Sequence, residues 1–148
     1  MGQEGMEKLR GAGWETFDHV ADIGVRGIGL TVEEAFENGA KALFSIMVED
    51  LSEVIPRETV PVSCSSYDLT GLFVAWLNEL IGVADIREMV FREFTVQINN
   101  VSLKGTAKGQ RWDQGNISRG IEVKGATFTK AIVEKSNGFY VAQCVVDV

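Results

Sequence analysis

Hydrophobic residues recur at two different periods along this chain, and the change of period predicts where its helices and strands lie. In residues 31–47 and again in residues 69–81 they follow the 3.6-residue spacing of a helix that buries one face. Residues 14–29, residues 59–64 and most of the chain after Asp85 alternate instead with the two-residue period of strands. We therefore expect strands, a helix, a strand, a second helix and then a run of strands.

The beginnings of both predicted helices carry capping signals. Thr31 and Glu34 form a capping box, in which the hydroxyl accepts from one free backbone N–H and the carboxylate reaches back to another. Ser65 and Asp68 resemble a second capping box before the second helix. The apolar stripe of each helix is wide enough to cover a sheet, and core packing is the simplest interpretation of its aromatic residues.

Turn residues between the later strands predict antiparallel neighbours. Asn137-Gly138 is the strongest hairpin signal in the chain, because a type I′ turn requires positive φ at both central positions. Asn99-Asn100 is a second candidate turn, and Pro61 places the strand around it at a sheet edge or entry position. Two helices followed by such a run of strands predict an α+β fold, with both helices packed on one side of a mostly antiparallel sheet.

Length and composition indicate one domain with an ordinary core. The 148 residues are 45% hydrophobic and only 24% charged, which excludes a disordered chain. Residues 1–13 are polar and contain several glycines, so we expect a flexible N-terminal arm there. The single folded domain is expected over residues 14–148.

The net charge and the cysteine content indicate which binding partners and which cellular compartment to expect. The formal net charge of −7 argues against strong direct binding to nucleic acid, which a basic face would provide. Cys64 and Cys144 lie too far apart to form a metal-binding pair and are expected to be thiols of a reducing compartment. Without a secretory signal, or the about 20 apolar residues that a membrane span needs, we expect a cytoplasmic protein. Its oligomeric state is left open.

Most familiar catalytic motifs are absent from the sequence. His19 is the only histidine, so neither a His-x-x-x-His pair nor a zinc-type cluster is present. The chain also lacks a P-loop and a Gly-x-Ser-x-Gly nucleophile elbow. A triad built on His19 would need a nucleophile that no spacing indicates, and a structural hydrogen-bonding role for this histidine is the alternative.

Carboxylates near the two ends of the sequence give a candidate cation site. Asp22 begins one predicted strand and Asp147 ends the last, so neighbouring strands would bring both together with the terminal carboxylate of Val148. Three such anions repel one another, and a divalent cation removes that repulsion. Oxygen ligands favour calcium, magnesium or manganese. The alternative is that Asp22 caps a turn and that Asp147 is solvated.

Five segments of the chain together resemble the archease family. They are Asp18-His19-Val20-Ala21-Asp22-Ile23-Gly24, which is similar to the family's His-Thr-Ala-Asp-Ile signature, and residues 31–36, 76–80, 122–127 and 145–148. The resemblance covers nearly everything from Phe17 onward. Val20 departs from it, because the family usually has threonine there, and a hydroxyl is lost beside Asp22.

The resemblance implies a function exercised on a partner enzyme. Archeases are small cytoplasmic proteins that assist RtcB-type RNA ligases in tRNA splicing and RNA repair, and they are not enzymes themselves. The implied role is to promote guanylylation of the ligase's active-site histidine. The ligase then turns over repeatedly and uses a broader range of nucleoside triphosphates.

The resemblance also implies which residues act. Asp22, Asp147 and Val148 match the family's metal ligands, with calcium expected and magnesium or manganese as alternatives. The residues expected to assist the partner are Lys124, Glu122 and His19. Two other interpretations stay open: a stand-alone metal-dependent hydrolase that uses Asp22 and Asp147, and a general chaperone-like binder without a site.

Overall fold

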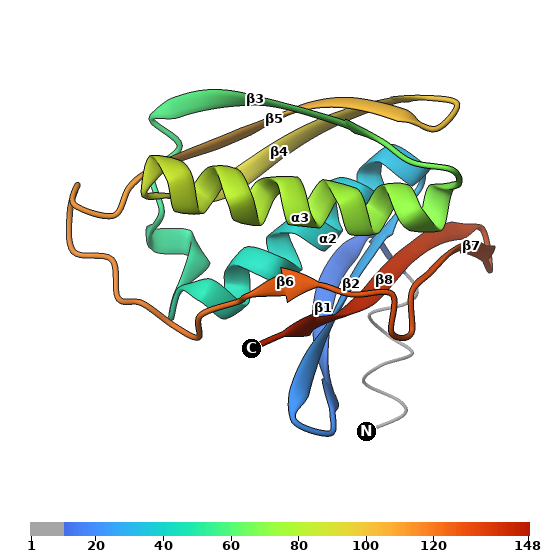
Figure 1. The fold of residues 1–148 in the computed structure, drawn as a ribbon, viewed down its shortest axis with the longest axis horizontal. Coiled ribbons are helices and arrows are strands. Elements are labelled where there is room, and N and C mark those ends of the chain that lie inside the picture. Colours follow the sequence, from blue (N-terminus) through green and yellow to red (C-terminus); the bar gives the residue numbers. More distant parts are fainter. Residues whose placement is uncertain (1–10) are drawn as a thin grey trace.

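In residues 11–148, which the computed structural model of the protein describes, two antiparallel sheets lie on either side of two helices (Figure 1). The elements are β1 (Gly13–His19), β2 (Asp22–Gly29), α2 (Val32–Met47), a 3₁₀ turn (Leu51–Glu53), β3 (Glu58–Ser65), α3 (Leu69–Arg87), β4 (Met89–Asn99), β5 (Ser102–Arg111), β6 (Gly125–Ala126), β7 (Ile132–Ser136) and β8 (Phe139–Asp147). The larger sheet has the order β1-β2-β8-β6, with β7 also paired to β8, and the smaller sheet has the order β3-β5-β4.

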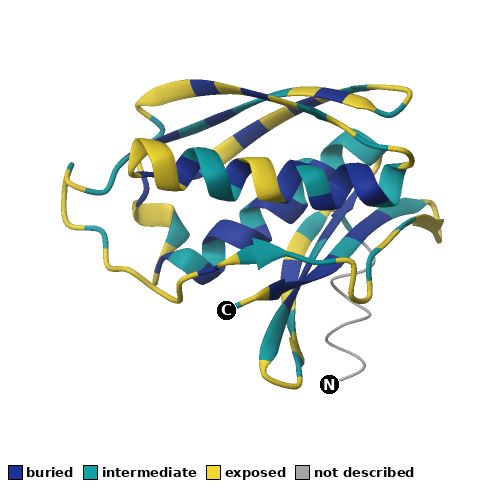
Figure 2. Ribbon diagram, in the orientation of Figure 1, coloured by how far each residue is buried: buried dark blue, intermediate teal, exposed yellow. Residues whose placement is uncertain are grey.

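The buried residues lie mainly on the parts of the helices and strands that face the layer between the two sheets (Figure 2), and apolar side chains form the core there. Trp76 of α3 is fully buried, and its indole N–H donates to the backbone oxygen of Phe36 in α2 at 3.0 Å. Phe94 of β4 packs edge-on against Trp76, with ring centroids 6.3 Å apart. Each large apolar side chain buried here contributes about 1.5–3 kcal/mol, and the set fixes α3 relative to α2 and the smaller sheet.

α2 packs so closely on the larger sheet that β2 requires glycine at the contact. A Cβ at Gly27 would lie 2.0 Å from the backbone oxygen of Ala35 and 2.2 Å from the nitrogen of Gly39. Neither backbone atom can move without displacing the helix. This contact therefore sets the position of β2 and, with it, of Asp22 at the start of the strand.

The first helix begins as its capping box predicts. The Thr31 hydroxyl accepts from the Glu34 N–H at 3.0 Å, and the Glu34 carboxylate accepts from the Leu30 N–H at 2.6 Å. Two backbone N–H groups at the helix start are thus satisfied by side chains. α2 then covers residues 32–47, in agreement with the predicted range.

The second predicted capping box is wrong by three residues. Ser65 is the last residue of β3, where it pairs with Ser102, so its backbone belongs to the ladder. Asp68 caps α3 instead and accepts from the Gly71 N–H at 2.7 Å. α3 also continues to Arg87, beyond the end that the apolar spacing predicts.

Turns and sheet edges follow the predicted chemistry. Asn137 and Gly138, between β7 and β8, have φ of 53° and 83°, the positive pair that the predicted hairpin turn requires. Asn100 has φ of 60° in the turn between β4 and β5, at the predicted Asn99-Asn100 position. β3, which carries Pro61, lies at an edge of the smaller sheet as expected.

After β5 the chain forms an irregular segment, residues 112–124, which we call the strap. The Glu49 N–H donates to the Ser118 oxygen at 3.0 Å, and the Gly120 N–H donates to the Met47 oxygen at 2.9 Å. The middle of the strap thus forms its backbone hydrogen bonds with the end of α2 and the residues that follow it, not with a sheet. The later part of the strap has the alternating pattern of a strand, but the next strand, β6, begins only at Gly125.

The predicted α+β class is confirmed, but the antiparallel strands form two sheets rather than one. At the edge of β4 that does not pair with β5, the Val96 N–H donates to the Glu37 carboxylate of α2 at 2.9 Å. A further strand would need that N–H. Burial raises the pKa of Glu37, and the hydrogen bond from Val96 opposes that effect.

α3 is long and apolar enough, by length and composition alone, to span a membrane. The expectation that no stretch approaches this length therefore does not hold. In the fold, the helix packs as a core element between the sheets. Its fully buried side chains include Leu72, Phe73, Trp76, Leu77 and Leu80.

The predicted N-terminal arm, residues 1–13, lies mostly outside the described residues. Only residues 11–13 fall within them, and Gly13 already pairs with Ile28 as the first residue of β1. The folded part of the chain therefore includes Gly13, one residue before the predicted boundary.

Both cysteines are free thiols, as predicted. Burial raises the pKa of Cys64 to about 11, with the nearby Glu79 carboxylate adding to the effect, and burial raises the pKa of Cys144 to about 12. Because the thiolate is the reactive form, we expect iodoacetamide to modify the native protein slowly near neutral pH. Alkylation followed by mass spectrometry at increasing pH should label Cys64 before Cys144. Rapid labelling of native Cys144 would contradict its burial.

Candidate functional site

Asp22 and Asp147, distant in the sequence, meet at one end of the larger sheet. The antiparallel ladder of β2 and β8 pairs Ile23 with Val146, so the next residues outward, Asp22 and Asp147, lie opposite each other. Opposite residues of neighbouring antiparallel strands point to the same face, with Cβ atoms roughly 4.5–5.5 Å apart. The strands that carry Asp22 and Asp147 are therefore neighbours, as the candidate cation site requires.

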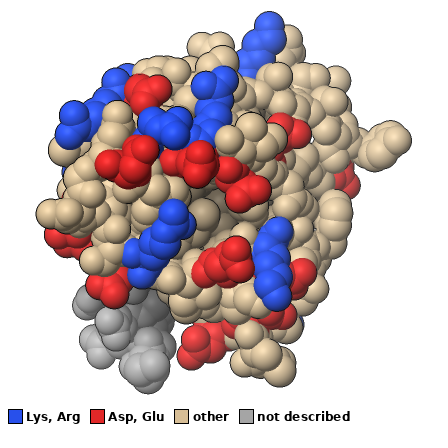
Figure 3. All heavy atoms as spheres, turned by 60° about the vertical axis from the view of Figure 1, so that its left-hand side comes forward, with Lys and Arg blue, Asp and Glu red and all other residues tan. Residues whose placement is uncertain are grey.

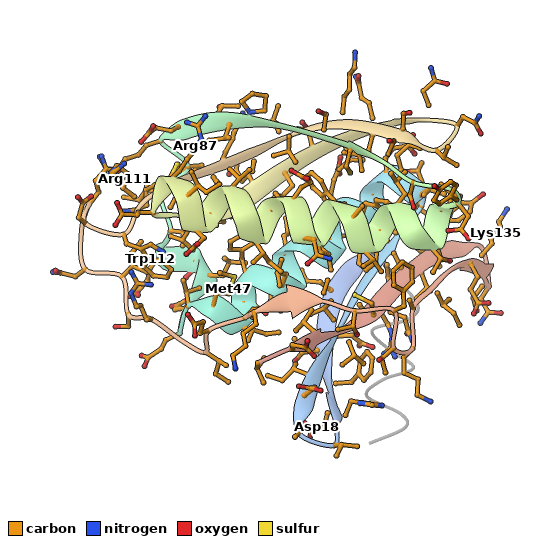
Figure 4. The ribbon with its side chains drawn as sticks, viewed as in Figure 1. Asp18, Met47, Arg87, Arg111, Trp112 and Lys135 are labelled. Carbon is orange, nitrogen blue, oxygen red and sulfur yellow. The ribbon has the colours of Figure 1, made fainter. Side chains whose placement is uncertain are left out.

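The carboxylate pair lies on the face of the larger sheet that points away from the helices. Gly27 faces α2, and Asp22, five positions earlier, points to the opposite face because side chains alternate along a strand. His19 pairs with Asp22 across β1 and shares its face. Asp18 precedes His19 by one position and points the other way. A row of His19, Asp22 and Asp147 thus crosses three strands near the hairpin tip, where Figure 4 labels Asp18.

The far side of this row is held by β6. Gly125 pairs with Asp147, and the Lys124 N–H donates to the Asp147 carbonyl oxygen at 2.8 Å. The main chain of Asp147 is therefore fixed against β6, while its side chain is exposed. Val148 follows directly, with its side chain partly buried against the core.

The carboxylate pair has no basic partner among the ion pairs of residues 11–148, which involve neither Asp22 nor Asp147. Two adjacent carboxylates repel each other, and a hard cation bridging them would relieve that repulsion. The same described residues hold no group of three or more His, Cys, Asp or Glu side chains placed for a metal ion. His19 is thus not placed as a third ligand, and a cation would need a main-chain oxygen of Val148 and water.

The hairpin tip beside Asp22 holds an unusual backbone conformation. Val20 has φ of 51°, in the left-handed region that β-branched residues rarely adopt, and its side chain is fully exposed. A side chain at this position lies in solvent. The departure from the family's usual threonine therefore leaves the packing around Asp22 unaffected.

Lys124 and Glu122 belong to a second region, on the helix side of the larger sheet. Both line a cavity of about 660 Å³ between α3 and the strap. Met47 and Trp112 also line it, and Figure 4 labels both at this end of the molecule. The structure therefore places Lys124 and Glu122 beside a cavity, and not on the face that carries Asp22.

Sequence reasoning missed this cavity because its lining comes from elements that are far apart in sequence. Met47 belongs to the apolar stripe of α2, which predicts core packing, and Trp112 follows a strand at the start of an irregular segment. One local signal was available. Gly82 lies in the interior of α3, and an interior helical glycine is costly enough to require a reason.

Comparison with known proteins gives the family. The sequence profile of the Archease protein family (MTH1598/TM1083) matches residues 14–148. A protein archease from Thermococcus gammatolerans is 40% identical over 139 residues, which cover 90% of this chain and 97% of that protein. A protein archease from Sulfurisphaera tokodaii is 37% identical over 137 residues, which cover 91% of this chain and 98% of that protein. The chain belongs to the archease family, which confirms the resemblance seen in the sequence.

Solved structures share the fold. The solution structure of protein 1598 from Methanobacterium thermoautotrophicum has a TM-score of 0.80 and 35% identity, and the match covers 92% of this chain and 99% of that chain. The crystal structure of an archease described as a possible chaperone, from Thermotoga maritima, has a TM-score of 0.60 and 17% identity. The match covers 90% of this chain and 96% of that chain. At 17% identity the similarity shows the fold alone.

Proposed function

We propose that this protein is a non-catalytic, cytoplasmic activator of an RtcB-type RNA ligase, acting through a divalent cation held by Asp22 and Asp147. It promotes guanylylation of the ligase and lets the ligase turn over repeatedly. The observation that carries the proposal is the ladder of β2 and β8, which sets the two carboxylates opposite each other at an accessible end of the sheet. Membership of the archease family supports the choice of partner.

The donor set fits a hard cation. Asp22, Asp147 and a main-chain oxygen of Val148 would hold the ion, with calcium expected and magnesium or manganese as alternatives. A divalent ion bound there supplies charge stabilisation for nucleotidyl transfer in the partner. The chain itself holds both carboxylates in place, because Asp147 is paired with β6 and follows Val146, which is paired with Ile23 of β2.

The charge of the protein suits an enzyme partner that itself binds RNA. The net charge of −7 would steer the protein toward a basic surface of such a ligase. On the face shown in Figure 3, lysine and arginine side chains are interspersed with aspartate and glutamate. That mixture supports the expectation of no strong direct binding to nucleic acid.

A ligation assay tests the proposal. Substoichiometric protein is added to an RtcB-type ligase with RNA and GTP, and we expect multiple turnovers where the ligase alone stops early. Unchanged turnover would contradict the proposal. Phosphate release without the ligase would favour a metal-dependent hydrolase instead.

A general chaperone-like role is the second candidate, because the Thermotoga maritima relative is described as a possible chaperone. It is tested with the same preparation. Suppression of the aggregation of an unrelated denatured protein, without any effect on ligase turnover, would favour that role over ligase activation.

Extending the chain beyond Val148 is expected to weaken calcium binding. A C-terminal tag converts the carboxylate of Val148 into a neutral carbonyl and removes one negative charge from the proposed ligands. Isothermal titration calorimetry of tagged and untagged protein measures the change, and an N-terminally tagged chain serves as the control. Equal calcium affinity in all three would exclude a role for that carboxylate.

A further inference from the structure

The cavity between α3 and the strap has the size and lining of a small-molecule site. Its volume of about 660 Å³ lies within the range of roughly 300–1,000 Å³ that ligand pockets occupy. Its deeper lining is apolar, with Met89 buried and Met47, Ile81 and Trp112 partly buried. Such a lining favours a ligand with a flat apolar body.

Charged side chains of both signs lie at the mouth of the cavity. Asp85, Glu122, Arg119 and Lys124 all line it and are exposed. The Arg119 guanidinium lies over the Trp112 ring, 4.0 Å from its centroid. The carboxylates can accept N–H groups from the edge of a heterocycle, and the Lys124 ammonium can attract a phosphate. The set therefore suits a ligand that carries both groups.

Gly82, in the interior of α3, is the independent sign of an occupant. Glycine destabilises a helix interior relative to alanine, so it usually has a packing or functional reason there. A Cβ at Gly82 would meet no atom within 4 Å, whereas one at Gly27 or Gly39 would collide with its neighbours. The fold itself therefore does not require this glycine. Gly82 does line the cavity, where a missing Cβ lets a flat group approach the helix backbone.

We propose that this cavity binds a purine nucleotide, with the base against Gly82 and Trp112 and the phosphates directed toward Lys124. The choice of a nucleotide as occupant rests on the proposed function, since the partner ligase consumes a nucleoside triphosphate. Lys124 also donates its backbone N–H to Asp147. The phosphate end of the ligand would thus lie near the strand end where the divalent cation is proposed.

Calorimetry of the full chain without ligase tests the inference. GTP and ATP are titrated in the presence of magnesium chloride, and we expect saturable binding of one nucleotide per chain. Gly82→Ala should weaken that binding by at least about tenfold. The same change should raise the melting temperature by roughly 2–4 °C, because alanine favours the helix. Loss of binding in a more stable protein is not explained by damage to the fold.

Two controls isolate the cavity. Glu79→Ala changes an exposed residue of α3 that does not line the cavity, and it should leave nucleotide affinity unchanged. Inorganic triphosphate should bind much more weakly than GTP, since it lacks the base. Absence of saturable GTP and ATP binding, equal affinity in Gly82→Ala, or equally tight binding of triphosphate would each overturn the inference.

The ligation assay separates this inference from the proposed function. If GTP does not bind and the ligase is still activated, the nucleotide site fails while the activator role stands. If GTP binds in a Gly82-dependent manner and the ligase is not activated, the site stands and the activator role fails. If Gly82→Ala impairs activation although neither nucleotide binds, the cavity receives a part of the ligase, and the nucleotide site is overturned.

Discussion

Asp147→Ala and Asp22→Ala are each expected to abolish activation of an RtcB-type ligase while leaving the protein folded. Each change removes one of the two facing carboxylates. Asp147 is exposed and Asp22 partly exposed, on the face of the larger sheet away from the helices, so no core packing is lost. Calcium affinity measured by calorimetry should fall by at least about a hundredfold, since loss of an outer-shell partner alone costs about tenfold to a hundredfold. Ligation turnover with the variant protein should return to that of the ligase alone.

Asp18→Ala is the matched control. Asp18 is an exposed aspartate of the same hairpin, but it points to the opposite face of the sheet from Asp22. This variant should keep both its calcium affinity and its effect on the ligase. Normal activation by Asp22→Ala or Asp147→Ala, or an equal loss in Asp18→Ala, would defeat the assignment of the site.

Gly27→Ala is expected to destabilise the fold by about 3 kcal/mol or more. The new methyl group would lie 2.0 Å from the backbone oxygen of Ala35 and 2.2 Å from the nitrogen of Gly39, so α2 would have to move away from β2. Overpacking against backbone cannot be relieved by a change of rotamer. Urea denaturation followed by circular dichroism measures the loss.

Gly82→Ala is the control for this second prediction, because it makes the same substitution in open space. It should stabilise the protein by roughly 0.5–1 kcal/mol, the helix preference of alanine over glycine. Opposite signs for the two variants would confirm that steric contact decides the outcome. A Gly27→Ala protein as stable as the original would show that α2 packs less tightly than described.

Local signals in the sequence were sufficient to predict most helices, strands and turns. Thr31 with Glu34 marks the start of α2 because both side chains bond to nearby backbone, and Asn137-Gly138 marks a hairpin because its φ requirement is local. Ser65 misled because it is the last residue of a strand, and only its pairing with Ser102 excludes a helix start there. Contacts between residues close in the sequence can therefore be predicted from it. A distant partner that competes for the same backbone groups cannot.

The arrangement of the sheets and the cavity depends on such distant partners. The strands separate into two sheets, and at the edge of the smaller one Glu37 of α2 accepts a hydrogen bond from the Val96 N–H, a contact that neither local pattern indicates. The sequence predicts the candidate cation site only on the condition that β2 and β8 are neighbours, because Asp22 and Asp147 meet only in that case. Apart from Gly82, no local signal predicts the cavity, because the strap that encloses it is held by the end of α2.

β8, the last strand in the sequence, lies inside the larger sheet, between β2 and both β6 and β7. During synthesis on the ribosome, the edge of β2 that pairs with β8 therefore stays unpaired until β8 has been synthesised. The smaller sheet and α3 come from one continuous stretch, residues 58–111, and can assemble earlier. A chain truncated before β8 would expose the edge of β2 to other chains and tend to aggregate. Because Asp22 and Asp147 meet only through this pairing, cation binding would report that β8 has taken its place in the larger sheet.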